Sequence, residues 1–324
     1  MRALVLLSGG LDSILAARII QGQGIEVLGL HFISLFYKNR KEVLAASLGI
    51  EVKEVDISEE FIGLVKGPRY GFGSHLNPCI DCKILMLRKA GDLLGELGAS
   101  FVVTGEVFGQ RPMSQNKNSL KLIEKKSGLE GLLLRPLSAK LLEETVPEKR
   151  GWVNRQGLLC ISGRGRRDQM ELAKELGIKE YGQPAGGCLL TDPEFSKRLK
   201  DLIAHEGLSR QNIELLKLGR HFRIAPQTRL IVGRNQDENL KLENLAQDQD
   251  YLFMPGEDTA GPTSLGRGQF DQAQIELCCS INCRYCDLNN REKIRIFYDR
   301  LPDKRGVSLE VLPLGEPQVA GLRI

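Results

Sequence analysis

The chain of 324 residues is longer than one ordinary hydrophobic core supports, so its length predicts two domains. Hydrophobic residues make up 42% of the chain and charged residues 27%, which is typical of a globular protein and excludes a disordered or membrane-embedded one. No apolar run approaches the roughly 20 residues that cross a bilayer. The opening MRALVLLSGG is interrupted too early for a signal peptide. We therefore expect a cytoplasmic protein without membrane contact.

The net charge of +4 is small, but it is unevenly distributed. Residues 151–235 carry 15 Lys and Arg against 9 Asp and Glu. A basic middle segment permits nucleic-acid binding without requiring it.

The first hundred residues alternate short apolar runs with segments in which apolar residues have helical spacing. This pattern predicts strands at residues 3–7, 25–33, 51–57 and 100–106, and helices at residues 11–24, 41–49 and 82–98. Strands alternating with helices of this length favour an α/β fold with a doubly wound parallel sheet. In such a sheet, ligands bind at the carboxyl ends of the strands.

The pattern changes in the second half of the chain. Helices are expected around an arginine-rich loop after Arg135, followed by a loop at 183–193 and a helix at 193–207. Strands are then predicted at 228–235, 250–256 and 293–299, with helices at 236–246 and 270–288. We expect three parts: an α/β domain over 1–150, a basic connector over 151–209, and a smaller α+β domain over 210–324.

The sequence LLSGGLDS, directly after the first predicted strand, has the composition of a phosphate-binding loop. Gly9 and Gly10 let the main chain approach phosphate oxygens closely, and Ser8 and Ser13 can donate hydroxyl hydrogen bonds. The start of the following helix adds a positive dipole end. Asp12 suits a bare anion site only if a divalent cation bridges it to the phosphates.

The order S-G-G-x-D-S, placed between a strand and a helix, resembles the PP-loop of ATP pyrophosphatases. This resemblance implies binding of ATP with Mg²⁺, release of pyrophosphate, and transfer of AMP to an oxygen of the substrate, with Asp12 helping to hold the metal. The structural alternative is a tight strand-to-helix turn with a capping aspartate.

Three cysteines supply a second group of candidates. Cys79 and Cys82 in NPCIDCK have the spacing of a metal pair, an iron–sulfur pair or a redox dithiol. Cys188 follows two glycines in PAGGC, where a loop could present its thiol.

With these cysteines, residues 1–205 resemble the PP-loop domain of the tRNA 4-thiouridine synthase (ThiI) family. The segments TGEVFGQRPMSQ, LLRPLSAK and PAGGCLLTD carry the likeness. The resemblance places the sulfur-handling cysteine at Cys188 and implies that Lys83 balances phosphate charge. It implies ATP contacts at Leu6, Leu7, Ser8, Gly9, Gly10, Leu11, Asp12, Ser13, His31, Phe32, Lys83, Gly105 and Gln115.

The chain departs from that family, since neither an N-terminal tRNA-binding extension nor a rhodanese-like segment is expected. A CxxC with one distant cysteine instead resembles thiolases that hold a [4Fe-4S] cluster on three cysteines. We therefore favour a cluster on Cys79, Cys82 and Cys188, whose open iron would deliver hydrosulfide. The alternatives are a persulfide on Cys188 and a structural zinc with His75 or Cys160 as fourth ligand.

Four further cysteines lie in CCSINCRYC. Cys279, Cys283 and Cys286 fall on one stripe of a predicted helix, and Cys278 adjoins them. Free cysteine behaves as a small hydrophobe, so packing is favoured over a metal site or redox switch.

The last 110 residues or so resemble the NFACT RNA-binding family, through LGRHFRI, LIVGRNQDEN, DYLFMPGEDTAGPT and KIRIFYD. This resemblance implies RNA docking. Its candidate phosphate contacts are Arg220, His221, Arg223 and Arg234. The arginine-rich loop adds Arg164, Arg166 and Arg167, because clustered arginines suit phosphate recognition.

Taken together, these features predict an ATP-dependent tRNA sulfurtransferase. A uridine carbonyl oxygen would be adenylated and then replaced by sulfur from a cysteine desulfurase or from free sulfide, with 4-thiouridine the favoured product. Cys188 and Asp12 are the predicted catalytic residues. The alternatives are a PP-loop amide ligase that uses ammonia and a non-catalytic, nucleotide-sensing RNA-binding protein.

Overall fold

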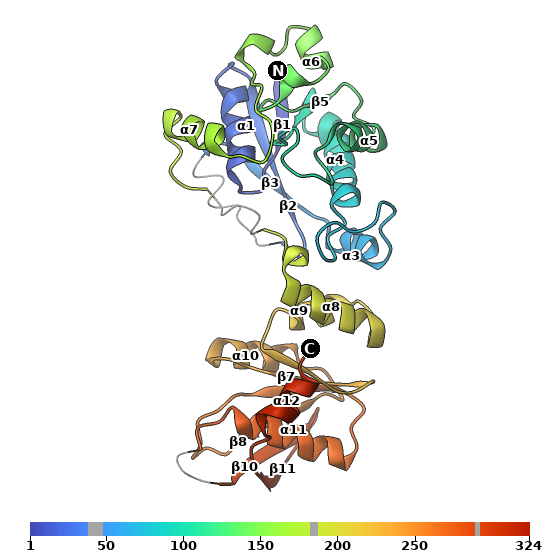
Figure 1. Ribbon diagram of the computed structural model, residues 1–324, viewed down its shortest axis with the longest axis vertical. Coiled ribbons are helices and arrows are strands. Elements are labelled where there is room, and N and C mark those ends of the chain that lie inside the picture. The colour runs from blue at the N-terminus through green and yellow to red at the C-terminus, as the bar shows by residue number, and fades with distance from the viewer. Residues whose placement is uncertain (38–47, 182–186, 289–291) are drawn as a thin grey trace. The chain divides into compact units, whose positions relative to one another are not determined.

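The computed structural model describes residues 1–37, 48–181, 187–288 and 292–324 (Figure 1). The chain forms two compact units, Met1–Asp192 and Pro193–Ile324. Most of the helix predicted over 41–49, and part of the loop predicted over 183–193, lie outside the described residues. The first unit includes the beginning of the predicted connector and the second its end, and the three-part division stays a prediction.

The first unit is built on a five-stranded parallel sheet in the order β3-β2-β1-β4-β5. Its strands are β1 (Arg2–Leu6), β2 (Glu26–Ile33), β3 (Val52–Asp56), β4 (Phe101–Val103) and β5 (Leu133–Leu134). The four predicted strands and the doubly wound sheet are confirmed. The central strand β1 is buried at Ala3, Leu4 and Val5, as the apolar run predicted.

Helices cover both faces of this sheet (Figure 1). They are α1 (Leu11–Gln21), α3 (Ser58–Lys66), α4 (Cys79–Glu96), α5 (Lys117–Ser127), α6 (Val146–Lys149) and α7 (Arg167–Glu175), with short 3₁₀ turns at Ala139–Leu141, Arg155–Gly157 and Leu189–Thr191. α1 packs with α7, and α4 packs with α5. The functional consequence is that α1 begins at the carboxyl end of β1, where the glycine-rich loop lies.

The second unit is built on a six-stranded antiparallel sheet in the order β11-β10-β8-β9-β7-β6. Its strands are β6 (Arg220–Ala225), β7 (Thr228–Val232), β8 (Tyr251–Pro255), β9 (Ser264–Gly268), β10 (Ile294–Arg300) and β11 (Asp303–Val311). Its helices are α8 (Pro193–His205), α9 (Arg210–Leu215), α10 (Gln236–Leu245), α11 (Gln272–Arg284) and α12 (Glu316–Leu322). The predicted α+β class of this part is confirmed.

The clustered cysteines of α11 belong to the core of the second unit. Cys278, Cys279 and Cys283 have no solvent exposure and pack with residues such as Phe222 and Phe253. Burial raises the pKa of Cys279 to about 12, so its thiol is protonated at neutral pH. No group of metal-ligating side chains occurs among the residues that the structure describes. These observations agree with the packing interpretation.

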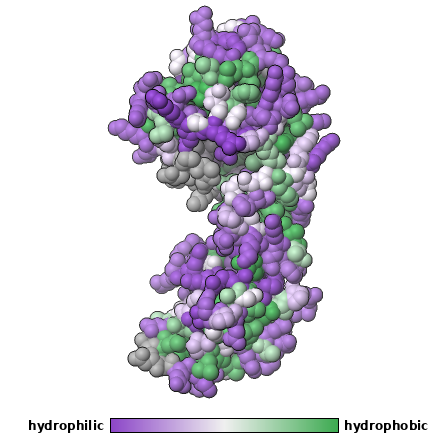
Figure 2. Space-filling view, in the orientation of Figure 1, coloured by the Kyte–Doolittle hydropathy of each residue, from purple (hydrophilic) through white to green (hydrophobic). Residues whose placement is uncertain are grey.

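Within the described part of the chain, every helix is too short or too polar to cross a bilayer. Hydrophilic residues are spread over much of the visible surface of both units (Figure 2).

Replacing Cys279 with alanine tests the packing interpretation. The substitution removes one buried sulfur, and we expect the free energy of unfolding of the second unit to fall by about 1–2 kcal/mol. Urea denaturation followed by circular dichroism measures this change, and a metal chelator should leave the wild-type curve unchanged. Unfolding by the chelator would show that the cysteines hold a metal instead.

Candidate functional site

A cavity of about 490 Å³ opens in the first unit, at the carboxyl ends of β1 and β4. Five segments line it: the loop into α1, one side of α4, the residues after β4, the loop before α5 and the loop before α7. The lining residues are Leu6, Ser8, Gly10, Leu11, Asp12, Ser13, Lys83, Met86, Leu87, Thr104, Gly105, Glu106, Gln110, Arg111, Gln115, Arg164 and Arg166.

The loop into α1 is held by its own serines. The Ser13 hydroxyl donates to the Gly10 carbonyl at 2.8 Å and accepts from the backbone N–H of Ser8 at 3.3 Å. Gly9 has a φ of +76°, a conformation that favours glycine. No side chain caps α1, which leaves the start of the helix available to an anion.

Gly105, after β4, sets how closely α1 approaches the sheet. A Cβ atom at this position would lie 2.4 Å from the carbonyl carbon and oxygen of Asp12 and 2.5 Å from the Ser13 nitrogen. These neighbours are backbone atoms and cannot turn aside. A glycine is therefore required here to keep the first turn of α1 in place.

Asp12 lies in this turn with one carboxylate oxygen, Oδ1, buried and without a hydrogen-bond partner. Burial raises the pKa of Asp12, against the hydrogen bond from Gln110 and the charges of Arg166 and Arg111. A buried carboxylate oxygen beside a phosphate-binding loop is a suitable Mg²⁺ ligand. The residues present therefore fit the predicted cation.

A chain of buried ion pairs fixes one wall of the cavity. Glu106 pairs with Lys83 of α4 and with Arg135 Nε at 3.0 Å, and Arg135 Nη1 reaches Glu124 of α5 at 2.9 Å. Burial alone would raise the pKa of Glu106, but the charges of Lys83 and Arg135 and their hydrogen bonds lower it to about 2. Glu106 therefore stays ionised and holds Lys83 at the cavity.

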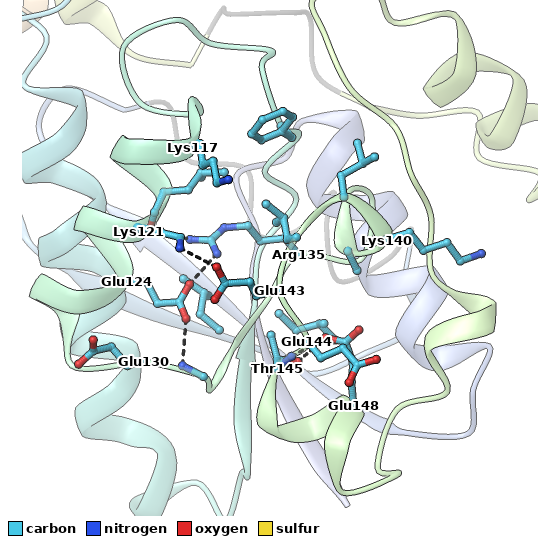
Figure 3. A pocket seen from close by; sticks show the side chains of 18 of the residues that line it. Lys117, Lys121, Glu124, Glu130, Arg135, Lys140, Glu143, Glu144, Thr145 and Glu148 are labelled. Atoms are coloured by element: carbon cyan, nitrogen blue, oxygen red, sulfur yellow. Dashed lines mark hydrogen bonds and ion pairs between the residues drawn. The ribbon is translucent and has the colours of Figure 1, made fainter.

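A second cavity, of about 800 Å³, lies at the other end of this series of ion pairs and is lined by Arg135 and Glu124, among other residues (Figure 3). In the figure, Lys121 reaches across to Glu143, while Glu124 bridges Arg135 and a backbone N–H, that of Gly131. Five lysines and five glutamates line this cavity beside Arg135. Its charges nearly balance, so it is a weaker candidate for phosphate than the first cavity.

The first cavity brings together most of the predicted ATP contacts. The predicted residues that line it are Leu6, Ser8, Gly10, Leu11, Asp12, Ser13, Lys83, Gly105 and Gln115. Leu7, Gly9, His31 and Phe32 are not among the lining residues. His31 is buried, and its Nδ1 lies 2.8 Å from the Leu7 carbonyl oxygen, so it supports the loop from behind.

The three predicted sulfur-site cysteines lie near one another. Cys79 and Cys82 occupy the first turn of α4, which begins three residues before the predicted helix at 82–98. Cys188 forms an isolated β-bridge with Tyr37, whose hydroxyl lies 2.8 Å from the Cys82 sulfur. Burial is the largest of the causes that raise the pKa of both Cys82 and Cys188 to about 12, and the neighbouring Cys79 contributes to both shifts.

Cations that line the cavity also lower the pKa of these thiols. Burial raises the pKa of Cys79, while Lys83 and Arg111 lower it. Arg111 also lowers the pKa of Cys188. Arg111 therefore acts electrostatically on Asp12 at the loop and on two of the three thiols.

Cys79, Cys82 and Cys188 are the predicted ligands of the [4Fe-4S] cluster. Their chemistry is suitable, since all three are thiols, and they lie close together: Cys79 raises the pKa of Cys82 and of Cys188, and Cys188 also raises that of Cys82. As arranged, however, the described residues contain no group of three that could hold a metal ion. The structure therefore does not show a cluster site on these thiols, and the cluster stays a prediction.

The residues predicted to contact RNA differ from one another in their partners within the protein. In the second unit Arg223 pairs with Asp201 and Glu206, and Arg234 pairs with Glu238. His221 is buried, with Nε2 2.8 Å from the Leu218 carbonyl oxygen.

The Cζ atom of Arg220 lies over the ring of Tyr285, 4.6 Å from the ring centre. In the first unit Arg164 and Arg166 line the cavity, whereas the exposed Arg167 pairs with Glu171.

Sequence reasoning missed several residues of the site. Glu106 and Arg135 lie within the quoted segments TGEVFGQRPMSQ and LLRPLSAK, but no role was assigned to them. Arg111 lies in the first of these segments as well. Tyr37 had no local signal, because only the fold brings it to Cys82.

Substituting Gly105 with alanine should displace the first turn of α1. We expect affinity for ATP to fall by about tenfold, roughly 1.4 kcal/mol, because the loop would lose its geometry. Isothermal titration calorimetry measures the change. Gly95→Ala is the matched control, since a Cβ there meets no heavy atom within 4 Å. Unchanged ATP affinity in a folded Gly105→Ala protein would contradict the assignment.

Substituting Glu106 with glutamine should leave Lys83 and Arg135 without their shared carboxylate. At pH 7 we expect a loss of about 3–5 kcal/mol in the free energy of unfolding. A carboxylate whose pKa is lower in the folded protein than in the unfolded chain stabilises the fold at pH values above the unfolded pKa. This stabilisation is lost as the pH falls through the folded pKa. The loss should therefore be smaller at pH 3 by about 2 kcal/mol.

Urea denaturation at both pH values checks this expectation. Glu96→Gln is the control, because that exposed carboxylate pairs with Lys53 at the surface and should change stability by less than about 0.5 kcal/mol. An equal effect of Glu106→Gln at both pH values would show that its charge does not stabilise the fold.

Comparison with known proteins gives two family matches. Residues 1–147 match the tRNA methyl transferase HUP domain, and residues 219–321 match the NFACT protein RNA binding domain. The tRNA-specific 2-thiouridylase MnmA of Helicobacter hepaticus is 32% identical over 140 residues, 38% of this chain and 39% of that protein. The tRNA sulfurtransferase of Desulfurococcus amylolyticus is 31% identical over 177 residues, 50% of this chain and 34% of that protein.

The chain thus spans between a third and two fifths of the length of these relatives. Among solved structures, a 4-thiouridine synthetase–RNA complex with bound ATP matches with a TM-score of 0.37 at 19% identity, covering 67% of this chain and 51% of that chain. The chain thus combines a region similar to the tRNA methyl transferase HUP domain with a region similar to the NFACT protein RNA binding domain, and each match covers less than half of the chain.

Proposed function

We propose that the protein is an ATP-dependent tRNA sulfurtransferase. One observation carries this proposal: the cavity lined by the PP-loop lies beside three thiols. The charge of Arg111 lowers the pKa of Asp12 in the loop and of two of these thiols. A thiolase needs these two parts together, because the base must be activated before sulfur can replace its oxygen.

The activating step is an adenylation. A uridine carbonyl oxygen attacks the α-phosphorus of ATP, the bond to the α,β-bridging oxygen breaks, and pyrophosphate leaves with that electron pair. Asp12 would hold Mg²⁺, which would neutralise part of the triphosphate charge. Lys83, fixed by Glu106, contributes a positive charge to the same cavity.

The second step replaces the activated oxygen with sulfur. A sulfur nucleophile attacks the adenylated carbon, and AMP leaves with the former carbonyl oxygen. Cys188, Cys79 and Cys82 are the thiols near the cavity, and Cys188 is half-buried rather than enclosed. A cysteine desulfurase or free sulfide would supply the sulfur, and the [4Fe-4S] cluster on these thiols stays a prediction.

The second unit would hold the RNA. Its NFACT match supports RNA binding, and the names of the relatives of the first unit support tRNA as the substrate. Within this proposal, 4-thiouridine is the product that the sequence resemblance favours. The relatives are named both for 2-thiouridine and for tRNA sulfur transfer in general.

Substituting Cys188 with alanine separates the two steps. We expect thiolation of tRNA to fall by a factor on the order of 100 or more, as for loss of a covalent catalyst. ATP binding and RNA-dependent pyrophosphate release should persist, because the PP-loop is untouched. Mass spectrometry of digested tRNA and a pyrophosphate assay measure the two steps.

Cys160→Ala is the matched control, since this thiol is exposed. Retained thiolation in Cys188→Ala would show that this thiol does not handle the sulfur. Pyrophosphate release without thiolated tRNA in the wild type would favour a ligase that uses ammonia, and absent pyrophosphate release in the wild type would favour a nucleotide-sensing RNA-binding protein. Iron and sulfide analysis after anaerobic purification tests the cluster, which is wrong if no iron is bound.

A further inference from the structure

Three arginines from two loops line the nucleotide cavity. Arg111 precedes α5, and Arg164 and Arg166 precede α7. None of these guanidinium groups forms a hydrogen bond or ion pair with a residue in the described ranges. Arg111 and Arg164 are exposed and Arg166 is half-buried, so all three side chains can reach a ligand.

The charge of the cavity depends on these arginines. Without them, the charged lining would be Lys83 against Asp12 and Glu106, which is a net negative wall. Lys83 is moreover paired with Glu106. A wall of this kind repels a triphosphate, and the partial positive charge of the start of α1 would have to overcome it. With the arginines, the lining carries four cations against two carboxylates.

We propose that Arg111, Arg164 and Arg166 bind the β- and γ-phosphates of ATP and hold the pyrophosphate as it leaves. Guanidinium groups suit this role because they donate paired hydrogen bonds to phosphate oxygens and remain charged at any physiological pH. The inference rests on the proposed function, because it assigns residues to the ATP site of that reaction.

The environment of Asp12 agrees with this assignment. The positive charges of Arg166 and Arg111 lower the pKa of its carboxyl group, so both arginines lie near the first turn of α1. The PP-loop and the two arginine-bearing loops therefore contribute to one phosphate site. α1 supplies backbone dipoles there, and the loops supply full charges.

The neighbouring Arg167 provides the contrast. Sequence reasoning grouped it with Arg164 and Arg166 as an RNA contact. In the structure it is the first residue of α7, pairs with Glu171, and is absent from the lining of the cavity. The arginine-rich loop is therefore divided between the cavity and the exposed surface.

The test compares ligand binding by three variants with ligand binding by Arg167→Gln, the matched control. The three variants are Arg111→Gln, Arg164→Gln and Arg166→Gln. Dissociation constants for ATP, AMP, inorganic pyrophosphate and unmodified tRNA are measured by calorimetry and filter binding. Each cavity variant should bind ATP and pyrophosphate about tenfold more weakly. AMP binding should change less than about twofold, and Arg167→Gln should bind ATP, AMP and pyrophosphate as the wild type does.

Two results would overturn the inference. If the cavity variants weaken tRNA binding while ATP binding is unchanged, the arginines contact RNA. If ATP and AMP are weakened equally, the variants disturb the loop instead of removing phosphate contacts.

The proposed function is tested separately by the same proteins. Weaker ATP binding in the variants, with no thiolated tRNA from the wild type, would reject the sulfurtransferase and leave the arginine assignment standing. Thiolated tRNA from the wild type, with ATP binding unchanged in the variants, would reject the arginine assignment alone.

Discussion

The buried carboxylate of Glu106 is the contact on which the shape of the nucleotide cavity depends. It lies just after β4 and joins Lys83 of α4 to Arg135, and Arg135 in turn joins Glu124 of α5. A charge with so little contact with water is tolerated only when it is paired. The same carboxylate therefore connects α4 directly, and α5 through Arg135, to the end of β4, and it holds the ammonium group of Lys83 at the cavity.

The parts of this arrangement that could be predicted from the sequence are those with a local pattern. The apolar run of β1, the glycines and serines after it and the helical spacing of α1 predicted both the sheet and the phosphate loop. Other parts have no such pattern. α5 is rich in lysine and polar residues and buries only Leu120 and Ile123 among its apolar side chains, and β5 has only two residues, so neither has a long apolar pattern. The pairing of Glu106 with Arg135 joins positions 29 residues apart and depends on tertiary structure alone.

The arginine-rich loop shows how a correct pattern can leave the partner open. Clustered arginines indicate phosphate, and the sequence offers two phosphate ligands, RNA and ATP. Composition cannot choose between them, because both present the same oxygens to a guanidinium group. The fold separates the members of the cluster by position, with Arg166 in the cavity and Arg167 paired on α7.

The two halves of the site are electrostatically connected. Lys83 and Arg111 line the cavity, and both lower the pKa of Cys79, while Arg111 also lowers that of Cys188. An anion bound in the cavity offsets part of this positive charge and so disfavours the thiolates. Charge in the nucleotide cavity therefore affects the pKa of the neighbouring thiols.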